Sequence, residues 1–253
     1  MNATQHEAHM QFDHLGETYD IFGRSPFRQF MEYPTTFAAM GDISGLSILD
    51  YGCGSGLYTR MLKRKGANRC VGVDATPSMI EHAQGIEKST ALGAEYVVMD
   101  DKFPQGFEGA FDIVLAVYVL PFMTDVEQLE AWFRNSTKCL RPGGRLVAVS
   151  GSSDTKNDPG YFQQYGFRLY KDEAPEGTEP HPCKLDLCYD TLDNKGIQTY
   201  LWTKARLEDA SKKAGFGDFE WCEPVIKEGK VDQSFWEPVL SRPNTYTFRC
   251  TLL

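Results

Sequence analysis

The sequence lacks paired cysteines, long apolar runs and an excess of positive charge. Its seven cysteines are odd in number and include no Cys-x-x-Cys pair, which favours reduced thiols and a cytoplasmic protein over a disulfide framework. The longest apolar run, 113–123, contains Pro121 and is too short to cross a bilayer. Residues 1–10 show no basic segment followed by an apolar one, so we expect neither export nor membrane insertion.

The charge balance is acidic. The chain has 26 Lys and Arg against 35 Asp and Glu, which gives a formal net charge of -9 at pH 7. The field of such a chain repels phosphate backbones and anionic membrane surfaces. We therefore expect neither nucleic acid nor a membrane as a partner.

Size and patterning indicate an α/β protein. The 253 residues are 42% hydrophobic and 24% charged, a balance typical of one large soluble domain or of a core with an insertion. From about residue 42 onward, short apolar runs alternate with helical patterns, which is typical of a parallel sheet wound with crossover helices. The pattern predicts strands over 47–50, 70–74, 94–99, 111–118, 146–150, 219–222 and 246–252. It predicts helices over 57–65, from residue 77, over about 125–140, and over 203–214.

Local signals mark where several of these elements begin or end. Thr76 and Pro77 suit the N-cap and the first position of a helix. Thr124 and Glu127 have the spacing of a capping box, in which each side chain satisfies a backbone donor at the start of the helix. The segment 141–144, Arg-Pro-Gly-Gly, suits a type II turn.

Two segments lie outside this alternation, residues 1–41 and 151–202. Within the second, apolar and polar residues alternate over 185–189 and 197–201, and residues 193–196 suit a hairpin turn between them. We interpret both segments as candidate lids over the core.

A glycine-rich turn carries the strongest chemical signal. Residues 49–56 read Leu-Asp-Tyr-Gly-Cys-Gly-Ser-Gly, at the end of the first predicted strand. Free backbone N–H groups and missing Cβ atoms in such a turn let a ligand approach closely. A dinucleotide fingerprint would need a small residue where the chain has Leu57 or Thr59, which weakens the NAD interpretation. The pattern Asp-x-Gly-x-Gly-x-Gly instead resembles the first motif of class I S-adenosylmethionine (SAM) dependent methyltransferases.

The resemblance extends over about residues 43–150. Phe-Asp-Ile-Val at 111–114 and Leu-Arg-Pro-Gly-Gly at 140–144 resemble the family's signatures around its fourth and fifth strands. The resemblance implies a Rossmann-like α/β fold, with a mostly parallel seven-stranded sheet, an antiparallel last strand, helices on both faces and a lid or cap insertion. The implied domains are an N-terminal helical lid (1–41), a SAM-binding core (42–150 and 203–253) and a substrate-cap insertion (151–202).

Acidic residues end three successive predicted strands. In the family, an acid that ends the second strand accepts both ribose hydroxyls, and Asp74 matches this position. The acid that accepts from the adenine amino group matches Asp100, with Asp101 beside it as the alternative. Asp50 matches the acid near the methionine ammonium. Ligands in open α/β sheets bind outside the carboxyl ends of the strands, where these acids would lie.

The resemblance implies SAM as the cofactor, S-adenosylhomocysteine (SAH) as its product, and no metal. In many relatives a Tyr-Asp pair closes over SAM, and Tyr19 with Asp20 matches it. The further predicted cofactor-binding residues are Arg28, Gly52, Cys53, Gly54, Ala75, Met79 and Ala116. His181, Cys183 and Cys188 do not have a zinc spacing, so we expect no metal site there.

Aromatic residues in and near the insertion suit a flat or apolar acceptor, and covering the sheet would explain each of them equally well. The predicted acceptor-binding residues are Tyr118, Tyr161, Tyr165, Trp202 and Trp236, the last in a loop. No catalytic base is assigned, and His14 and His181, in the two lid segments, are the candidates. The segment 116–122 lacks the family's motifs for nucleobase, glutamine and arginine substrates, which disfavours macromolecular acceptors.

Shorter motifs resemble bacterial small-molecule N-methyltransferases of the toxoflavin pathway: Tyr-Asp at 19–20, Pro-Phe-Arg at 26–28, Leu-Tyr-Thr-Arg at 57–60, Tyr-Gly at 165–166 and Ala-Gly-Phe at 214–216. That family acts on azapteridine ring nitrogens, so the resemblance implies N-methylation of a small aromatic or N-heterocyclic metabolite. The alternatives are O- or C-methylation of another small metabolite, a SAM- or SAH-binding protein without catalysis, and a nicotinamide oxidoreductase. We expect a monomer or a homodimer.

Overall fold

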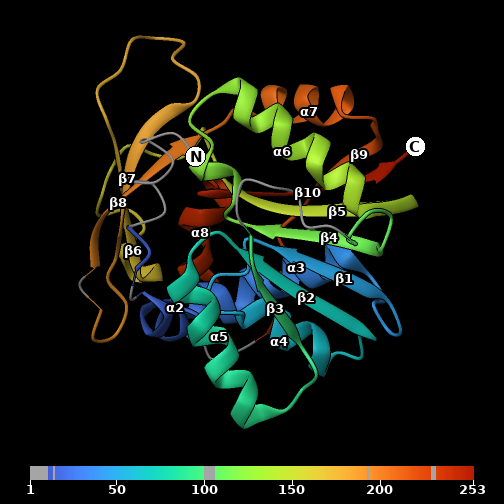
Figure 1. Ribbon diagram of the computed structural model, residues 1–253. Helices are drawn as coiled ribbons and strands as arrows, with labels where there is room; N and C mark the ends of the chain where they lie inside the picture. Colours follow the sequence, from blue (N-terminus) through green and yellow to red (C-terminus); the bar gives the residue numbers. More distant parts are fainter. Residues whose placement is uncertain (1–10, 14, 100–105, 193, 229–231) are drawn as a thin grey trace.

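The computed structural model describes residues 11–13, 15–99, 106–192, 194–228 and 232–253. A seven-stranded sheet forms its core, in the order β3-β2-β1-β4-β5-β10-β9 (Figure 1). Its strands are β1 (Ser47–Tyr51), β2 (Arg69–Asp74), β3 (Glu95–Val98), β4 (Phe111–Val117), β5 (Leu140–Gly151), β9 (Phe216–Cys222) and β10 (Thr245–Leu252). The pairs from β3 to β5 are parallel, whereas β10 is antiparallel to both β5 and β9. This confirms the predicted mostly parallel seven-stranded sheet with an antiparallel last strand.

Helices cover both faces of this sheet (Figure 1). On one face, α6 (Val126–Cys139) and α7 (Lys204–Lys213) bury their apolar sides against the strands. On the other face lie α3 (Tyr33–Met40) and α4 (Leu57–Arg64), and α5 (Pro77–Thr90) packs beside them against β3. The sheet is therefore the middle layer of three.

The centre of the sheet positions the site. All residues of β4 from Phe111 to Ala116 are buried, as the nearly continuous apolar sequence of this strand predicts for a strand covered on both faces. The strand order reverses at β1, which lies between β2 and β4. Open α/β sheets bind ligands at this point, outside the carboxyl ends of the strands.

The start of α6 differs from the prediction. Its N-cap is Asp125, whose Oδ1 accepts a hydrogen bond from the Gln128 backbone N–H at 2.9 Å, and the Gln128 side chain donates to Asp125 Oδ2 at 2.8 Å. The capping pair thus lies one residue later than the predicted Thr124–Glu127 pair, because Asp125 has the extended backbone that a cap requires. Gly143 has the φ of +74° that the third position of a type II turn requires, but it lies within β5.

A second, antiparallel sheet is built from β6 (Phe167–Lys171), β7 (His181–Leu187) and β8 (Asn194–Leu201). The predicted hairpin is confirmed by the pairing of Leu185 with Ile197. β8 already begins at Asn194, inside the segment predicted as the turn, and Asp193 lies outside the described residues.

Short helices pack against this second sheet. They are α2 (Gly16–Phe22), the π-helix η1 (Arg28–Glu32), the 3-10 helices η2 (Leu120–Phe122) and η3 (Gln163–Tyr165), and α8 (Gln233–Ser241). An aromatic cluster joins them, and its buried members include Phe22, Phe27, Phe162, Tyr165, Phe167 and Trp236. The prediction of a loop around Trp236 is wrong, because Trp236 lies in α8, whose internal Pro238 hides the helical pattern.

Among the described helices, none combines the length and the apolar character that crossing a membrane would require.

Candidate active site

The carboxyl ends of β1, β2 and β4 border a cavity of about 520 Å³. The described lining comes from β1 and the glycine-rich turn (50–55), the end of β2 (74–76), the segments 117–119 and 122–124 after β4, parts of α4, α5 and α6, Met99, and Phe12, Tyr19 and Arg28 of the N-terminal segment. The charged side chains in this described lining are Arg28, Asp50 and Asp74. All other described lining is neutral, and much of it is aromatic or apolar.

Asp74, at the end of β2, shapes the glycine-rich turn. Its Oδ2 accepts a hydrogen bond from the Gly54 backbone N–H at 2.8 Å, and its Oδ1 accepts one from the Thr76 N–H at 2.9 Å. Gly54 has a φ of +52°, in the left-handed region that favours glycine. The carboxylate therefore holds the turn and borders the cavity at the same time.

Asp50, at the end of β1, is a buried acid in the cavity wall. The Thr59 hydroxyl donates to its Oδ2 at 2.6 Å. Burial raises the pKa of Asp50 from 3.8 to about 6, and the Thr59 hydrogen bond opposes this shift. At neutral pH Asp50 is mostly ionised and can attract a cationic ligand group.

Tyr118, the first residue after β4, has a strained backbone. Its φ is +57°, which is uncommon for a residue other than glycine. Its hydroxyl donates to Glu32 Oε2 at 2.7 Å, and Glu32 Oε1 accepts from Arg28 Nε at 2.8 Å. Tyr118 and Arg28 line the cavity, whereas Glu32 is buried next to them and is not part of the described lining.

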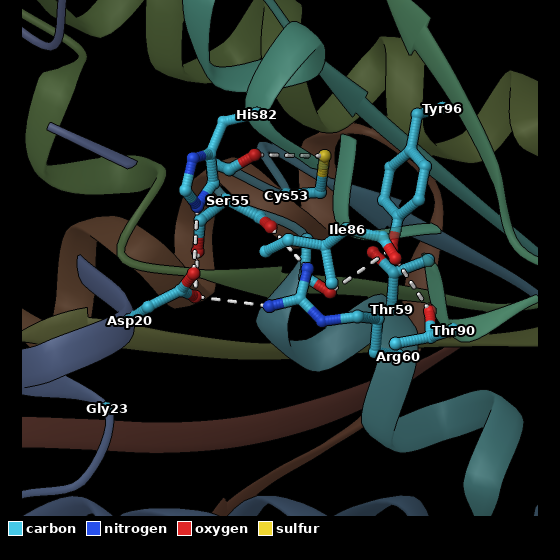
Figure 2. Close-up of polar contacts among 12 residues, drawn as sticks. Asp20, Gly23, Cys53, Ser55, Thr59, Arg60, His82, Ile86, Thr90 and Tyr96 are labelled. Atoms are coloured by element: carbon cyan, nitrogen blue, oxygen red, sulfur yellow. Dashed lines mark hydrogen bonds and ion pairs between the residues drawn. The ribbon is translucent and has the colours of Figure 1, made fainter. Parts of the chain in front are cut away.

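Asp20 of α2 ties the N-terminal segment to the core, as Figure 2 shows. Its Oδ1 accepts from Ser55 Oγ at 2.9 Å and from Arg60 Nη2 at 3.1 Å, and its Oδ2 lies 2.8 Å from His82 Nε2. These partners belong to the glycine-rich turn, α4 and α5. Because Tyr19 precedes Asp20 and lines the cavity, the cluster fixes the wall that α2 contributes.

Comparison with known proteins identifies the family. Residues 48–144 match the family described as "Methyltransferase domain". The demethylmenaquinone methyltransferase of Lactococcus lactis subsp. lactis is 34% identical over 199 residues, which are 74% of this chain and 71% of that protein. The chain belongs to the family of SAM-dependent methyltransferases.

Other members of the family are similar over shorter stretches or in fold. The ubiquinone biosynthesis O-methyltransferase of Methylocella silvestris is 33% identical over 136 residues, 54% of this chain and 51% of that protein. The chain spans about half or less of the length of the first three curated relatives that it matches. The SAM-dependent methyltransferase of Mesorhizobium loti shares the fold, with a TM-score of 0.60 at 20% identity over 91% of this chain and 99% of that one.

In this methyltransferase, most of the predicted cofactor-binding residues line one cavity. The residues that line it are Tyr19, Arg28, Asp50, Gly52, Cys53, Gly54, Asp74, Ala75 and Met79. Ala116 lies fully buried within β4 and is not in the described lining. Asp100 and Asp101 lie outside the described residues, although the preceding Met99 lines the cavity.

The predicted acceptor residues are mostly placed elsewhere. Tyr118 belongs to the described lining of the cavity, whereas this lining does not include Tyr161, Tyr165, Trp202 or Trp236. Tyr165 donates to the Phe235 carbonyl at 2.5 Å and stacks on Trp236, and Tyr161 donates to the Pro238 carbonyl at 3.0 Å. The indole of Trp202 is fully buried, and its Nε1 donates to the Leu120 carbonyl at 3.1 Å. Tyr161 and Tyr165 thus join the segment around η3 to α8, and Trp202, which follows β8, joins the second sheet to η2 and the core.

One of the two candidate bases, His181, does not belong to the described lining of the cavity. It is the first residue of β7, and its Nε2 lies 3.1 Å from the carbonyl oxygen of Asp172. His14 lies outside the described residues. In the part of the chain that the structure describes, no group of three or more His, Cys, Asp or Glu side chains could hold a metal ion.

The sequence analysis missed the aromatic wall of the cavity. Phe12 and Phe122 both line it, and their rings meet edge to face with centroids 4.8 Å apart. Trp132 of α6 lines it as well. The available signal was the position of Phe122 in the short segment that follows β4, at the edge of the sheet where ligands bind.

Proposed function

We propose that the protein transfers the methyl group of SAM to a small, neutral, aromatic acceptor, and that the methylated atom is a nitrogen of an N-heterocycle. The observation that carries this proposal is the distribution of charge around one cavity. Arg28, Asp50 and Asp74 are the charged residues of its described lining, and the rest of that lining is neutral and largely aromatic or apolar.

Each charged residue suits one part of the cofactor. Asp74 suits the ribose hydroxyls, because its carboxylate ends β2 beside the glycine-rich turn. Ionised Asp50 suits the methionine ammonium, and Arg28 suits the methionine carboxylate. Ala75 and Met79 border the space left for adenine, with Asp100 or Asp101 as the predicted partner of its amino group.

The acceptor is proposed to bind between Tyr118, Phe12 and Phe122. These aromatic side chains offer flat apolar surfaces and one hydroxyl, and no charged group. The sulfonium of SAM already activates the methyl group, so the protein chiefly has to align the acceptor in line and exclude water. Alignment of this kind lowers a reaction barrier by about 7–11 kcal/mol.

The choice of nitrogen rests on the resemblance of short motifs to azapteridine N-methyltransferases. A second candidate is O- or C-methylation of a quinol, which the names of the Lactococcus and Methylocella relatives favour. The proposal also includes a helical lid (1–41), a core (42–150 and 203–253), a cap (151–202), a cytoplasmic location and a monomer or homodimer.

Thermal unfolding with SAH, with NADH and with buffer alone tests the cofactor. SAH at a hundred times its Kd should add about 2.7 kcal/mol of stability, which is a shift of about 5–11 °C for a chain of this size. Asp74→Asn should remove the shift. A shift with NADH alone would overturn the proposal.

Labelled SAM with a panel of N-heterocycles and hydroquinones then tests the acceptor. Transfer to a ring nitrogen supports the proposal, and transfer to a quinol oxygen or carbon supports the second candidate. Binding of SAH without transfer to any member of the panel would favour a non-catalytic binding protein.

A further inference from the structure

We propose that Glu32 is a positioning residue, which holds the Arg28 guanidinium in the geometry that binds the carboxylate of the cofactor's methionine. The proposal rests on the proposed function, because it takes SAM and SAH as the ligands of the cavity. The sequence analysis assigned no role to Glu32.

Arg28 and Glu32 form a buried ion pair at the cavity wall. Arg28 is 5% exposed and Glu32 is 4% exposed. Arg28 Nε donates to Glu32 Oε1 at 2.8 Å. The Arg28 guanidinium also lies over the rings of Tyr33 and Tyr58, at 5.2 and 5.7 Å from their centroids. A guanidinium enclosed in this way has little freedom to reorient.

Glu32 collects hydrogen bonds from three different parts of the chain. Besides Arg28, the Tyr58 hydroxyl of α4 donates to Oε1 at 3.0 Å, and the Tyr118 hydroxyl after β4 donates to Oε2 at 2.7 Å. One carboxylate thus links the end of the cavity where Arg28 lies to the wall where Tyr118 lies.

The local backbone supports a functional role for this cluster. The segment Arg28–Glu32 is a π-helix, a rare conformation that occurs frequently at functional sites. Tyr118 adopts a left-handed backbone, which costs free energy in a residue with a side chain. Two unfavourable conformations therefore meet at Glu32, and its hydrogen bonds compensate for them.

The chemistry of the cofactor identifies the ligand of Arg28. Within the described lining Arg28 is the cation, and the carboxylate is the anionic group of SAM and SAH. A guanidinium binds a carboxylate best when its planar N–H groups are held in a fixed orientation. Because Glu32 takes the Nε–H of Arg28, it determines which N–H groups face the cavity.

The test compares SAH with its decarboxylated analogue, which differs only in the missing carboxylate. Isothermal titration calorimetry gives the ratio of the two Kd values, which measures carboxylate recognition apart from overall folding. Glu32→Asp keeps the charge but shortens the side chain, so its contact with Arg28 is lost. Glu32→Gln loses the charge but keeps an oxygen for Arg28 and Tyr58. We expect Glu32→Asp to reduce the preference for SAH about tenfold and Glu32→Gln to keep it within about twofold.

Thr36→Val is the matched control. Thr36 is buried in the same cluster, its hydroxyl donates to the Glu32 backbone carbonyl at 2.8 Å, and it lies 3.2 Å from the Tyr58 hydroxyl. It does not belong to the described lining of the cavity, and its hydrogen bond to Glu32 leaves the carboxylate to Arg28, Tyr58 and Tyr118. This variant should leave the ratio unchanged.

Three results would overturn the inference. If Glu32→Asp weakens both ligands equally, the role of Glu32 is structural. If Glu32→Gln loses the preference and Glu32→Asp keeps it, Glu32 acts through its charge and not through position. If SAH and its analogue bind the unaltered protein equally well, Arg28 does not recognise the carboxylate. Failure of the unaltered protein to bind either compound is a distinct result, which would overturn the proposed function and this inference with it.

Discussion

At the scale of single residues, we predict that Asp50 makes cofactor binding sensitive to pH. Burial raises its pKa from 3.8 to about 6. In the proposed binding mode, ionised Asp50 attracts the ammonium group of SAH, which stays protonated in this range, and protonated Asp50 does not. We predict that SAH affinity is constant well above this pKa and falls as the pH drops through it, approaching about tenfold per pH unit. Calorimetric titrations from about pH 5 to about pH 8 measure the profile.

Asp50→Asn is the control for this titration. It should bind SAH more weakly at neutral pH, with an affinity that no longer changes around the pKa of Asp50. A profile of the unaltered protein that stays flat across this range would show that Asp50 does not face the ammonium.

Trp202 illustrates the opposite case, a predicted acceptor residue whose contacts point to stability. Its indole is fully buried and donates to the Leu120 carbonyl, at the start of η2. We predict that Trp202→Phe lowers the free energy of unfolding by about 1–3 kcal/mol, because a buried carbonyl loses its donor, and that SAH affinity is unchanged. Urea unfolding and calorimetry check both statements. Unchanged stability together with lost methyl transfer would return Trp202 to the acceptor site.

Several residues of the cavity lining could be predicted because they lie at or just after strand ends. Asp50, Gly54 and Asp74 lie where a periodic pattern stops, and the carboxyl ends of parallel strands meet at one edge of the sheet. The position of Glu32 could not be found in this way. Its partners Tyr58 and Tyr118 come from distant segments, and nothing in the local pattern around Glu32 indicates that they converge.

At the scale of elements, the docking of α2 closes one side of the cavity. We predict that Asp20→Ala weakens SAH binding by about tenfold, because α2 loses its contacts with Ser55, Arg60 and His82, and the Tyr19 ring is no longer fixed. Asp13→Ala is the matched control. Asp13 lies in the same N-terminal segment as Asp20, and its carboxylate accepts an exposed hydrogen bond from the Ser78 hydroxyl of α5, which the substitution removes. Calorimetry should show little change for the control. Equal losses in the two variants would contradict a specific role of Asp20.

Element boundaries show what local sequence signals resolve. The helix predicted over 203–214 is α7, and Thr203 is its N-cap, because its hydroxyl accepts from the Arg206 N–H at 3.2 Å. At α6, Thr124 and Asp125 are adjacent and both suit a cap, so the backbone conformation decides between them. In α8, Pro238 interrupts the helical pattern of the sequence. The packing of Trp236 and Val239 in the aromatic cluster stabilises this helix.

At the scale of the whole molecule, the main sheet was predictable and the second sheet's position was not. The alternation of strands and helices predicts a parallel sheet with right-handed crossovers and tolerates errors at single boundaries, and the resemblance to the methyltransferase family implies the seven strands and the antiparallel last one. Where the β6–β7–β8 sheet packs depends on large aromatic side chains that suit a cavity wall and a core equally well.

The net charge of the molecule should distinguish the cofactor from its product. SAM carries one net positive charge, whereas SAH is a neutral zwitterion, so the field of a chain with a net charge of -9 attracts SAM and not SAH. We predict that the association rate of SAM falls severalfold when salt rises from about 0.01 to about 0.3 M, while that of SAH changes little. Trp132 lines the cavity, so stopped-flow fluorescence can follow both ligands. If the two rates fall equally with salt, the local charges of Arg28, Asp50 and Asp74 dominate, and the acidic surface has no part in selecting SAM over SAH.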